Sequence, residues 1–236
     1  MNTATLATIT MVALASAGAT KPVLAQTGDR VRVNGFAIDR TEVTITRFRA
    51  YAHSNNVVTA AEREGGGFEW GAGWERRPGW TVYRPFGRTP TSDDEPAVHV
   101  SFQEAQAYCI VAGGRLPTAE EWQSAAYTEQ REAPPAPFTR GKTYRYPVGD
   151  TPAGANTTAP DPWPLSAPAG QTRAGVNGLF DMGGNVWEWV SDRQGDQRRT
   201  MGGSWWYGPD QMTRDVVAFK PASFYAVYVG FRCAYD

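Results

Sequence analysis

The sequence predicts a single α+β domain that is rich in loops and has little regular secondary structure. The chain of 236 residues contains 9 Trp, 10 Tyr and 10 Phe beside 25 Gly and 17 Pro, a mixture typical of a core built on aromatic anchors and joined by turns. Signals for two or three helices are present, and the remaining apolar segments are short enough for strands. At this length the chain can bury one sizeable core.

The N-terminal third is expected to contain one strand, one helix and one structured loop. Val31–Asp39 has the composition of a strand. Thr44 is placed to cap a helix whose apolar residues share one face at helical spacing: Phe48, Tyr51 and Ala52. Gly65–Gly79 is dense in Gly and Trp and fits no regular element.

Two capping boxes predict the next two helices. Residues 101–104 (SFQE) begin a helix that stops at Gly113, and residues 118–121 (TAEE) begin a helix that buries Trp122. Residues 133–172 then show no periodicity and are too long for an ordinary connection. This segment is expected either to wrap around the domain or to be held by a group such as a metal ion.

The last third of the sequence returns to apolar strands and turns. Asn177–Asp192 and Thr200–Trp206 alternate short hydrophobic runs with glycines, and Tyr228–Ala234 is expected to be a closing strand. Trp187 and Trp189 alternate with their neighbours, as in a strand with an aromatic face, and core packing is their favoured role.

The first 25 residues are typical of a cleavable export signal. They contain one charged residue, Lys21, and an apolar run of small residues before residues 23–25 (VLA), which resemble a small-x-Ala cleavage pattern. Because the usual positive charges at the start are missing, the N-terminus of a cytosolic protein is the alternative. The run of about 16 residues is shorter than the roughly 20 that a stable membrane anchor needs. We therefore expect residues 26–236 to form one exported domain, periplasmic or secreted.

The charge balance excludes one class of partner. Lys and Arg number 23 and Asp and Glu number 24, which gives a net charge of −1. Without a basic surplus, binding to nucleic acid is not expected.

The two cysteines of the chain, Cys109 and Cys233, lie far apart in the sequence. An even pair in an exported chain favours one disulfide. Two buried free thiols are the alternative. A catalytic or metal-binding pair is favoured least, because the chain has no close C-x-x-C spacing.

Six segments of this sequence together resemble the formylglycine-generating enzyme family, also called the sulfatase-modifying factor domain. They are GFAIDRTEVTITRF (35–48), PAVHVSFQEAQAYCIVAGGRLPTAEEW (96–122), YPVGD (146–150), NGLFDMGGNVWEWVSD (177–192), MGGSW (201–205) and VGFRCA (229–234). They occur in the order found in the family. The resemblance implies an irregular, C-type-lectin-like α+β fold and places the two cysteines at the family's structural disulfide.

The resemblance also implies calcium. The positions that match the family's better-defined calcium site are Asp181, Gly184, Val186 and Glu188, where two side chains and two backbone carbonyls supply the hard oxygen ligands that Ca²⁺ prefers. A second site corresponds loosely to Asn156, Thr157 and Asp161. The alternative is that Asp181 is a turn residue and Glu188 a solvated strand residue.

The catalytic positions of the family are changed in this sequence. Family enzymes that make formylglycine carry a C-x-x-x-x-C pair after the GGSW turn, whose thiolates bind Cu(I), a metal that selects soft sulfur ligands. The matching positions here are Tyr207 and Met212. Neither residue provides a thiolate, so the resemblance implies neither a copper centre nor formylglycine-generating activity.

Three functions are compatible with this pattern. The first is a scaffold that binds a protein, peptide or small molecule through aromatic residues of the segments Ser204–Met212 and Phe219–Tyr228: Trp205, Trp206, Tyr207, Phe224, Tyr225 and Tyr228. The second is an oxidoreductase acting on another substrate, similar to the family member of pyoverdine maturation, with proton-transfer candidates Ser204, Tyr207 and His99. The third, a non-haem iron enzyme, has only His53 and His99 to draw on and is disfavoured. A hydrogen-bonded structural role is the favoured interpretation of His99.

Overall fold

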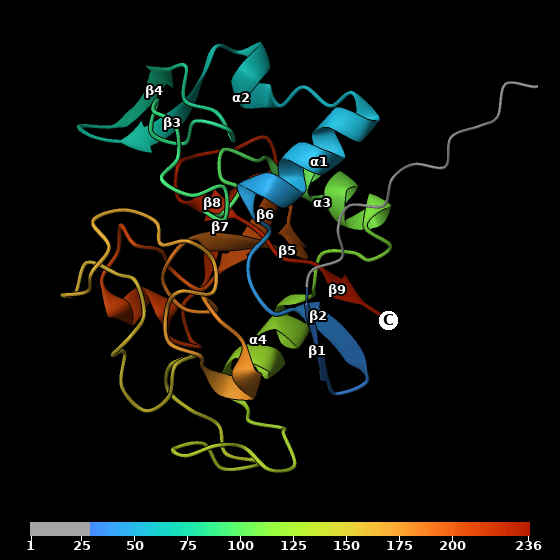
Figure 1. Cartoon of the computed structure of the whole chain (residues 1–236), viewed down its shortest axis with the longest axis vertical. Coiled ribbons are helices and arrows are strands. Elements are labelled where there is room, and N and C mark those ends of the chain that lie inside the picture. The colour runs from blue at the N-terminus through green and yellow to red at the C-terminus, as the bar shows by residue number, and fades with distance from the viewer. Residues whose placement is uncertain (1–28) are drawn as a thin grey trace, which may run out of the picture.

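The computed structural model describes residues 29–236, so the expected export signal (1–25) lies outside the described residues. The described part contains no helix that is both long and apolar enough to span a bilayer. Short helices and strands are joined by long irregular segments, which is the loop-rich α+β architecture that the sequence predicts (Figure 1).

The regular elements are short, and they fall into three small sheets and four α-helices within the described residues. The helices are α1 (Ile45–Asn55), α2 (Ala60–Arg63), α3 (Phe102–Val111) and α4 (Ala119–Tyr127), with 3-10 turns η1 (Val176–Gly178) and η2 (Pro209–Met212). The strands are β1 (Arg30–Val33), β2 (Phe36–Asp39), β3 (Gly66–Trp70), β4 (Trp74–Pro78), β5 (Trp187–Gln194), β6 (Gln197–Met201), β7 (Ala218–Pro221), β8 (Val229–Gly230) and β9 (Ala234–Tyr235). The sheet orders are β1-β2-β9, β3-β4 and β7-β6-β5-β8.

The expected strand Val31–Asp39 is two strands that form a hairpin. Asn34 and Gly35 adopt φ angles of 44° and 88°, the left-handed pair that a tight hairpin turn requires. Consequently β1 folds back on β2, with Val33 opposite Phe36. β9 joins the free edge of β2, so the first strands and the end of the chain share one sheet. The closing strand is likewise split, into β8 and β9.

The predicted helix starts are confirmed. Thr44, Ser101 and Thr118 are N-cap residues whose side chains accept a backbone N–H three residues on, and the last two form the expected capping boxes. Helix α3 ends at Val111, just before Gly113 takes a φ of 79°. Helix α2 is not among the predicted helices, although it begins with a further capping box at Thr59.

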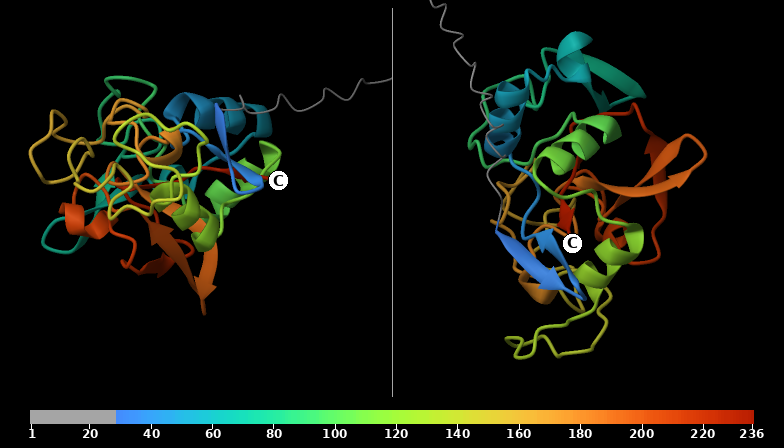
Figure 2. Two further views of the ribbon diagram at one scale, coloured as in Figure 1. Left: turned by 90° about the horizontal axis from the view of Figure 1, so that it is seen from below. Right: turned by 90° about the vertical axis from the view of Figure 1, so that its right-hand side faces the viewer.

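The segment Gly65–Gly79 is a hairpin rather than an irregular loop. β3 and β4 pair in register from Gly66 opposite Pro78 to Trp70 opposite Trp74. A Cβ on Gly67 would lie 2.1 Å from the ring of His99, so this strand needs glycine where it crosses the domain. The hairpin lies with α2 at one end of the molecule (Figures 1 and 2).

The core lies around β5 and its neighbours. Trp122 and Trp189 have no solvent exposure, and Trp189 donates its indole N–H to Val100 O at 3.0 Å. This confirms core packing for the aromatic face of β5. As expected, residues 133–172 contain no helix or strand; they run as loops over the side of the domain that also carries η1 (Figure 1).

Candidate functional site

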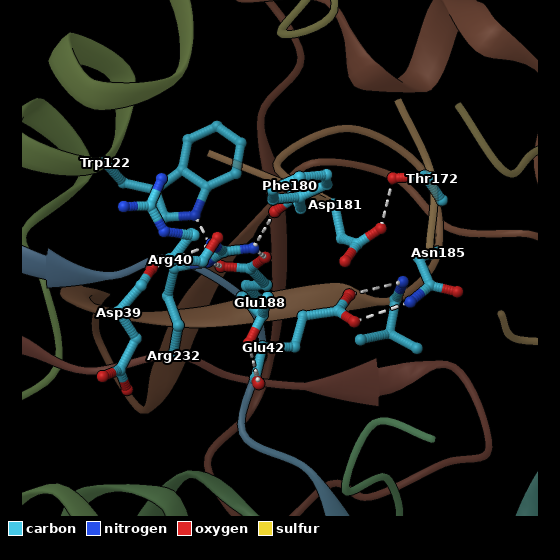
Figure 3. Close-up of polar contacts among 12 residues, drawn as sticks. Asp39, Arg40, Glu42, Trp122, Thr172, Phe180, Asp181, Asn185, Glu188 and Arg232 are labelled. Atoms are coloured by element: carbon cyan, nitrogen blue, oxygen red, sulfur yellow. Dashed lines mark hydrogen bonds and ion pairs between the residues drawn. The ribbon is translucent and has the colours of Figure 1, made fainter. Parts of the chain in front are cut away.

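A buried polar network underlies β5 (Figure 3). Arg232 and Glu188 have no solvent exposure and form a bidentate pair, Nη2 to Oε1 at 2.7 Å and Nε to Oε2 at 2.8 Å. Trp122 donates its indole N–H to the same carboxylate at 2.8 Å. The Arg232 guanidinium also donates to the carbonyl oxygens of Asp39, Arg40 and Phe180. Glu188 is therefore fully buried and not the solvated strand residue of the alternative interpretation.

Two further carboxyl groups lie close to this pair. Glu42 accepts from Asn185 Nδ2 at 2.6 Å and from Val186 N at 3.2 Å, and Asp181 accepts from Gly170 N and the Thr172 hydroxyl. Burial raises the pKa of Glu42 well above its usual value, and repulsion from Asp181 and Glu188 adds to the effect. Burial also raises the pKa of Asp181. We call Glu42, Asp181 and Glu188 the acidic cluster.

The acidic cluster has a charge imbalance that fits a cation. Three buried carboxyl groups face one guanidinium, that of Arg232, which leaves two negative charges uncompensated if all of them ionise. Asp181 has a φ of 59° and Gly184 a φ of 79°, and a Cβ on Gly184 would lie only 2.2 Å from Asn156 O. The backbone therefore folds tightly around this position. Two carboxylates among oxygen donors are the chemistry that Ca²⁺ takes, although the described residues hold no compact group of three acid, His or Cys side chains around one point.

The second expected calcium site is looser. Asn156 Oδ1 is buried without a hydrogen-bond partner in the described structure, and such an acceptor can serve as an oxygen ligand. Asp161 is engaged locally, since its carboxylate accepts from the backbone N–H groups of Thr157 and Trp163.

The positions that match the family's cysteine pair lie in different surroundings. Met212 is buried and packs in a small cluster with Tyr146, Val148 and Ala155. Tyr207 is half-buried, with its ring centre 5.7 Å from Trp187 and 5.8 Å from Tyr228. Both cysteines of the chain are joined in the Cys109–Cys233 disulfide, which confirms that pairing and leaves no free thiol.

His99 and Ser204 are held in the interior. His99 Nε2 donates to Pro85 O at 2.9 Å, and burial lowers the histidine pKa to about 4, so its ring is neutral near pH 7. Ser204 is 1% exposed, and its Oγ accepts from Trp206 N. Among the described residues no hydrogen bond joins the side chains of His99, Ser204 and Tyr207, so the three proton-transfer candidates do not form a linked set. His53 lies in the last turn of α1 and borders a shallow surface hollow with Tyr83.

The expected aromatic ligand surface is wrong for three of its six residues. Trp206 is 44% exposed, but Trp205, Tyr225 and Tyr228 are 8%, 2% and 1% exposed and pack inside the domain. Spacing could not reveal the burial of Tyr225 and Tyr228, because the β3–β4 hairpin covers them: Trp74 packs on Phe224 and Tyr228, and Phe68 packs on Tyr225.

An aromatic pocket opens instead between that hairpin and β7. It has a volume of about 380 Å³, and its walls come from β3, β4, β7, the turn after β7 and the turn before η2: Phe68, Trp74, Tyr207, Phe219, Lys220, Pro221 and Phe224. Tyr207 and the segment Phe219–Tyr228 are candidates from the sequence, whereas Phe68 and Trp74 are not, because the sequence of their hairpin predicts a loop. We call these seven residues the aromatic pocket.

Lys220 is the one cation in the wall of the aromatic pocket. Its Nζ lies 4.9 Å from the ring centre of the buried Trp187 and donates to Thr200 Oγ1 at 3.2 Å. Burial lowers the pKa of Lys220 to about 8. Within the described residues no carboxylate pairs with this amine. The pocket thus combines the rings of its aromatic residues, among them that of Tyr207, with one half-buried amine.

Comparisons with known proteins place this architecture in a family. Residues 10–236 match the family model described as sulfatase-modifying factor enzyme 1-like domain. The formylglycine-generating enzyme of Thermomonospora curvata is 30% identical over 87% of this chain and 84% of its own length. The inactive C-alpha-formylglycine-generating enzyme 2 of Bos taurus is 31% identical over 74% of this chain and 67% of its own length.

Among solved structures, PvdO from Pseudomonas aeruginosa superposes with a TM-score of 0.62 and 23% identity, over 84% of this chain and 79% of that chain, which shows a shared fold. The chain spans less of several other formylglycine-generating enzymes, between 54% and 64% of their lengths. The family match, the disulfide and the irregular α+β fold agree with one another. The chain belongs to the sulfatase-modifying factor enzyme 1-like domain family, whose members include formylglycine-generating enzymes.

Proposed function

We propose that this protein is a family member without formylglycine-generating activity and that it acts by binding a ligand in its aromatic pocket. The lack of formylglycine-generating activity rests on the Cys109–Cys233 disulfide, because both cysteines of the chain are in it. Cu(I) selects soft thiolate ligands, and a tyrosine hydroxyl and a buried thioether at positions 207 and 212 are poor substitutes. A relative of similar identity is itself named inactive, which supports the same interpretation.

The binding role rests on the shape and lining of the aromatic pocket. Its volume of about 380 Å³ falls in the range of small-molecule sites, and such sites are mostly apolar with few polar groups. Trp74 is 45% exposed at the pocket although it is a large aromatic residue, so a ligand could cover it. A small molecule or the aromatic side chain of a peptide would gain from these ring faces.

The lack of formylglycine-generating activity is tested with a cysteine-containing sulfatase peptide. The purified protein, supplied with Cu(I) and oxygen, is expected to consume no oxygen above background and to leave the peptide mass unchanged. The Thermomonospora curvata relative is the positive control. Conversion of the peptide cysteine to an aldehyde by this protein would overturn the proposal.

A second candidate is an oxidoreductase acting on a different substrate. One observation favours it: Tyr207, a proton-transfer candidate, lies in the wall of the pocket. Elemental analysis of protein purified without added metal separates the two functions. A redox metal in stoichiometric amount would favour the oxidoreductase, whereas calcium alone would favour the binding protein.

We also propose that the protein is exported and carries structural calcium. Export rests on the small, apolar N-terminal run and the two-cysteine usage, and it predicts that the mature protein recovered from the periplasm begins at or near Gln26. Calcium rests on the uncompensated charge of the acidic cluster, and Asp181, Glu188 and the backbone of Gly184 and Val186 would hold it. Bound calcium would supply positive charge that holds the surrounding loops together.

A further inference from the structure

Lys220 occupies an unusual position for a lysine. Its alkyl chain and amine are half-buried between β6 and the aromatic pocket, on the ring of Trp187 and the hydroxyl of Thr200. The other lysine of the described residues, Lys142, is exposed and pairs with Asp150 at 2.7 Å. Lys220 has no acid partner among the described residues, although burying a cation without a counter-ion is costly.

The groups around the amine leave it able to take an anion. The ring of Trp187 and the Thr200 hydroxyl satisfy part of its charge and one of its three donors. Arg198 lies opposite Lys220 on β6, but its guanidinium packs over Phe102. No carboxylate of the described residues therefore competes with a ligand for Nζ.

The other walls of the aromatic pocket favour a ligand that contains an aromatic ring. Trp74 and Phe224 meet edge to face with ring centres 4.7 Å apart, and Phe68, Phe219 and the Tyr207 ring complete the wall. Aromatic rings prefer such stacked and edge-to-face neighbours beyond the simple burial of apolar area. The volume of about 380 Å³ suits a ligand of one or two rings.

We propose that the aromatic pocket binds a small aromatic carboxylate, whose ring lies against Trp74 and Phe224 and whose carboxylate pairs with Lys220 Nζ. This inference deepens the proposed function and rests on its ligand-binding half. The Tyr207 ring lines the same pocket, and Lys220 is the one cation among the lining residues. An amine in a partly apolar site makes a stronger ion pair than one in water, because the surrounding dielectric constant is lower.

The test compares an acid with its neutral amide. Naphthaleneacetate and naphthaleneacetamide share the ring and the shape, and isothermal titration calorimetry at pH 7 gives both dissociation constants. The full-length mature protein is expected to bind the acid at least about tenfold more tightly than the amide, because a charge-assisted hydrogen bond to a half-buried amine contributes that much. Phenylacetate is expected to bind more tightly than cyclohexylacetate, which has the same charge and no aromatic ring.

Lys220→Met removes the amine and keeps an apolar chain of similar length. In this variant the ratio of acid to amide affinity is expected to fall to about one, while amide binding is retained. Lys142→Met is the matched control, because Lys142 also lies over an aromatic ring, that of Tyr144 at 4.5 Å, but at the exposed surface away from the pocket lining. It should leave the ratio unchanged, and thermal unfolding verifies that both variants are folded.

Equal binding of acid and amide by the natural sequence, a ratio that survives Lys220→Met, or no binding of either probe would each overturn this inference. These results are distinguishable from failure of the proposed function. If only the amide binds, the pocket still binds a ligand, but the proposed preference for an anionic ligand is refuted. The lack of formylglycine-generating activity is decided separately with the sulfatase peptide.

Discussion

Arg232 connects the C-terminal segment to the centre of the domain through every nitrogen of its guanidinium. Nε and Nη2 hold Glu188, while Nη1 and Nη2 donate to three backbone carbonyls of other segments. Both side chains of the pair have no solvent exposure. A buried ion pair adds little compared with apolar residues of the same shape, but removing one partner leaves a charge buried without compensation.

Replacing Arg232 with methionine is therefore expected to destabilise the protein strongly. We expect the free energy of unfolding to fall by about 3–5 kcal/mol, because Glu188 would lose its counter-ion. Urea denaturation measures the change. The double variant with Glu188→Gln should recover part of the loss, since the unpaired charge is then gone. A loss below about 1 kcal/mol in the single variant would show that the pair contributes little.

His99 makes the stability of the domain depend on pH. Its pKa is lowered from 6.5 to about 4 by burial, so between these values the unfolded chain binds a proton that the folded protein excludes. The neutral His99 contributes fully to the free energy of unfolding above pH 6.5, and this contribution is lost as the pH falls towards 4. Over that range it amounts to about 3 kcal/mol. His99→Asn, which does not titrate, is the comparison.

Urea denaturation at several pH values between 7 and 4 measures this effect. The free energy of unfolding of the natural sequence should fall relative to that of His99→Asn as the pH decreases. A difference between the two proteins that stays constant with pH would contradict a buried, neutral His99.

At the scale of single elements, the sequence predicts helices better than strands here. Helix starts are local chemistry: Ser101 and Thr118 cap their helices with the side chains that the sequence displays. The strands depend on distant partners. The β3–β4 hairpin exists because Gly67 lets it pass against His99, a contact across more than 30 positions that no periodicity reveals. The aromatic pocket could not be predicted for the same reason, because the hairpin is what brings Trp74 against Phe224.

The disulfide acts between two elements, α3 and the segment that enters β9. Cys109 and Cys233 are separated by 124 positions, and closing a loop of that length restricts the unfolded chain. The double variant Cys109→Ala/Cys233→Ala is expected to lose about 2–5 kcal/mol of stability in urea denaturation. Dithiothreitol should destabilise the natural sequence by a similar amount and leave the double variant unchanged. Equal stability with and without reductant would contradict this contribution.

For the whole molecule, the problem is how so much irregular chain remains ordered. Residues 133–172 have no helix or strand, and several of their backbone groups bond to buried side chains instead. Asn156 donates to Leu165 O, and Asn185 connects Asn156, Ala167 and Glu42. Several residues that form these hydrogen bonds belong to the family motifs. The resemblance therefore predicted the fold, whereas composition and periodicity predicted only the fold class.

The acidic cluster is joined to these hydrogen bonds through Asn185 and Glu42, and calcium bound there would stabilise the whole fold. Two of its carboxyl groups, Glu42 and Asp181, have raised pKa values because burial and mutual repulsion disfavour their charged forms. A divalent cation would remove that cost. Since a ligand that binds only the folded state stabilises it by mass action, calcium at about 100 times its dissociation constant should add about 2.7 kcal/mol and raise the melting temperature by about 5 °C or more.

Differential scanning calorimetry after chelation, with calcium or magnesium added back, measures this shift. Calcium should raise the melting temperature and magnesium should do so less, because Mg²⁺ demands a smaller and more regular shell of oxygen ligands. Asp181→Asn should abolish the calcium effect, whereas Asp150→Asn should keep it, because Asp150 is an exposed acid paired with Lys142. An unchanged melting temperature on adding calcium would mean that the acidic cluster is neutralised by protons and by Arg232 alone.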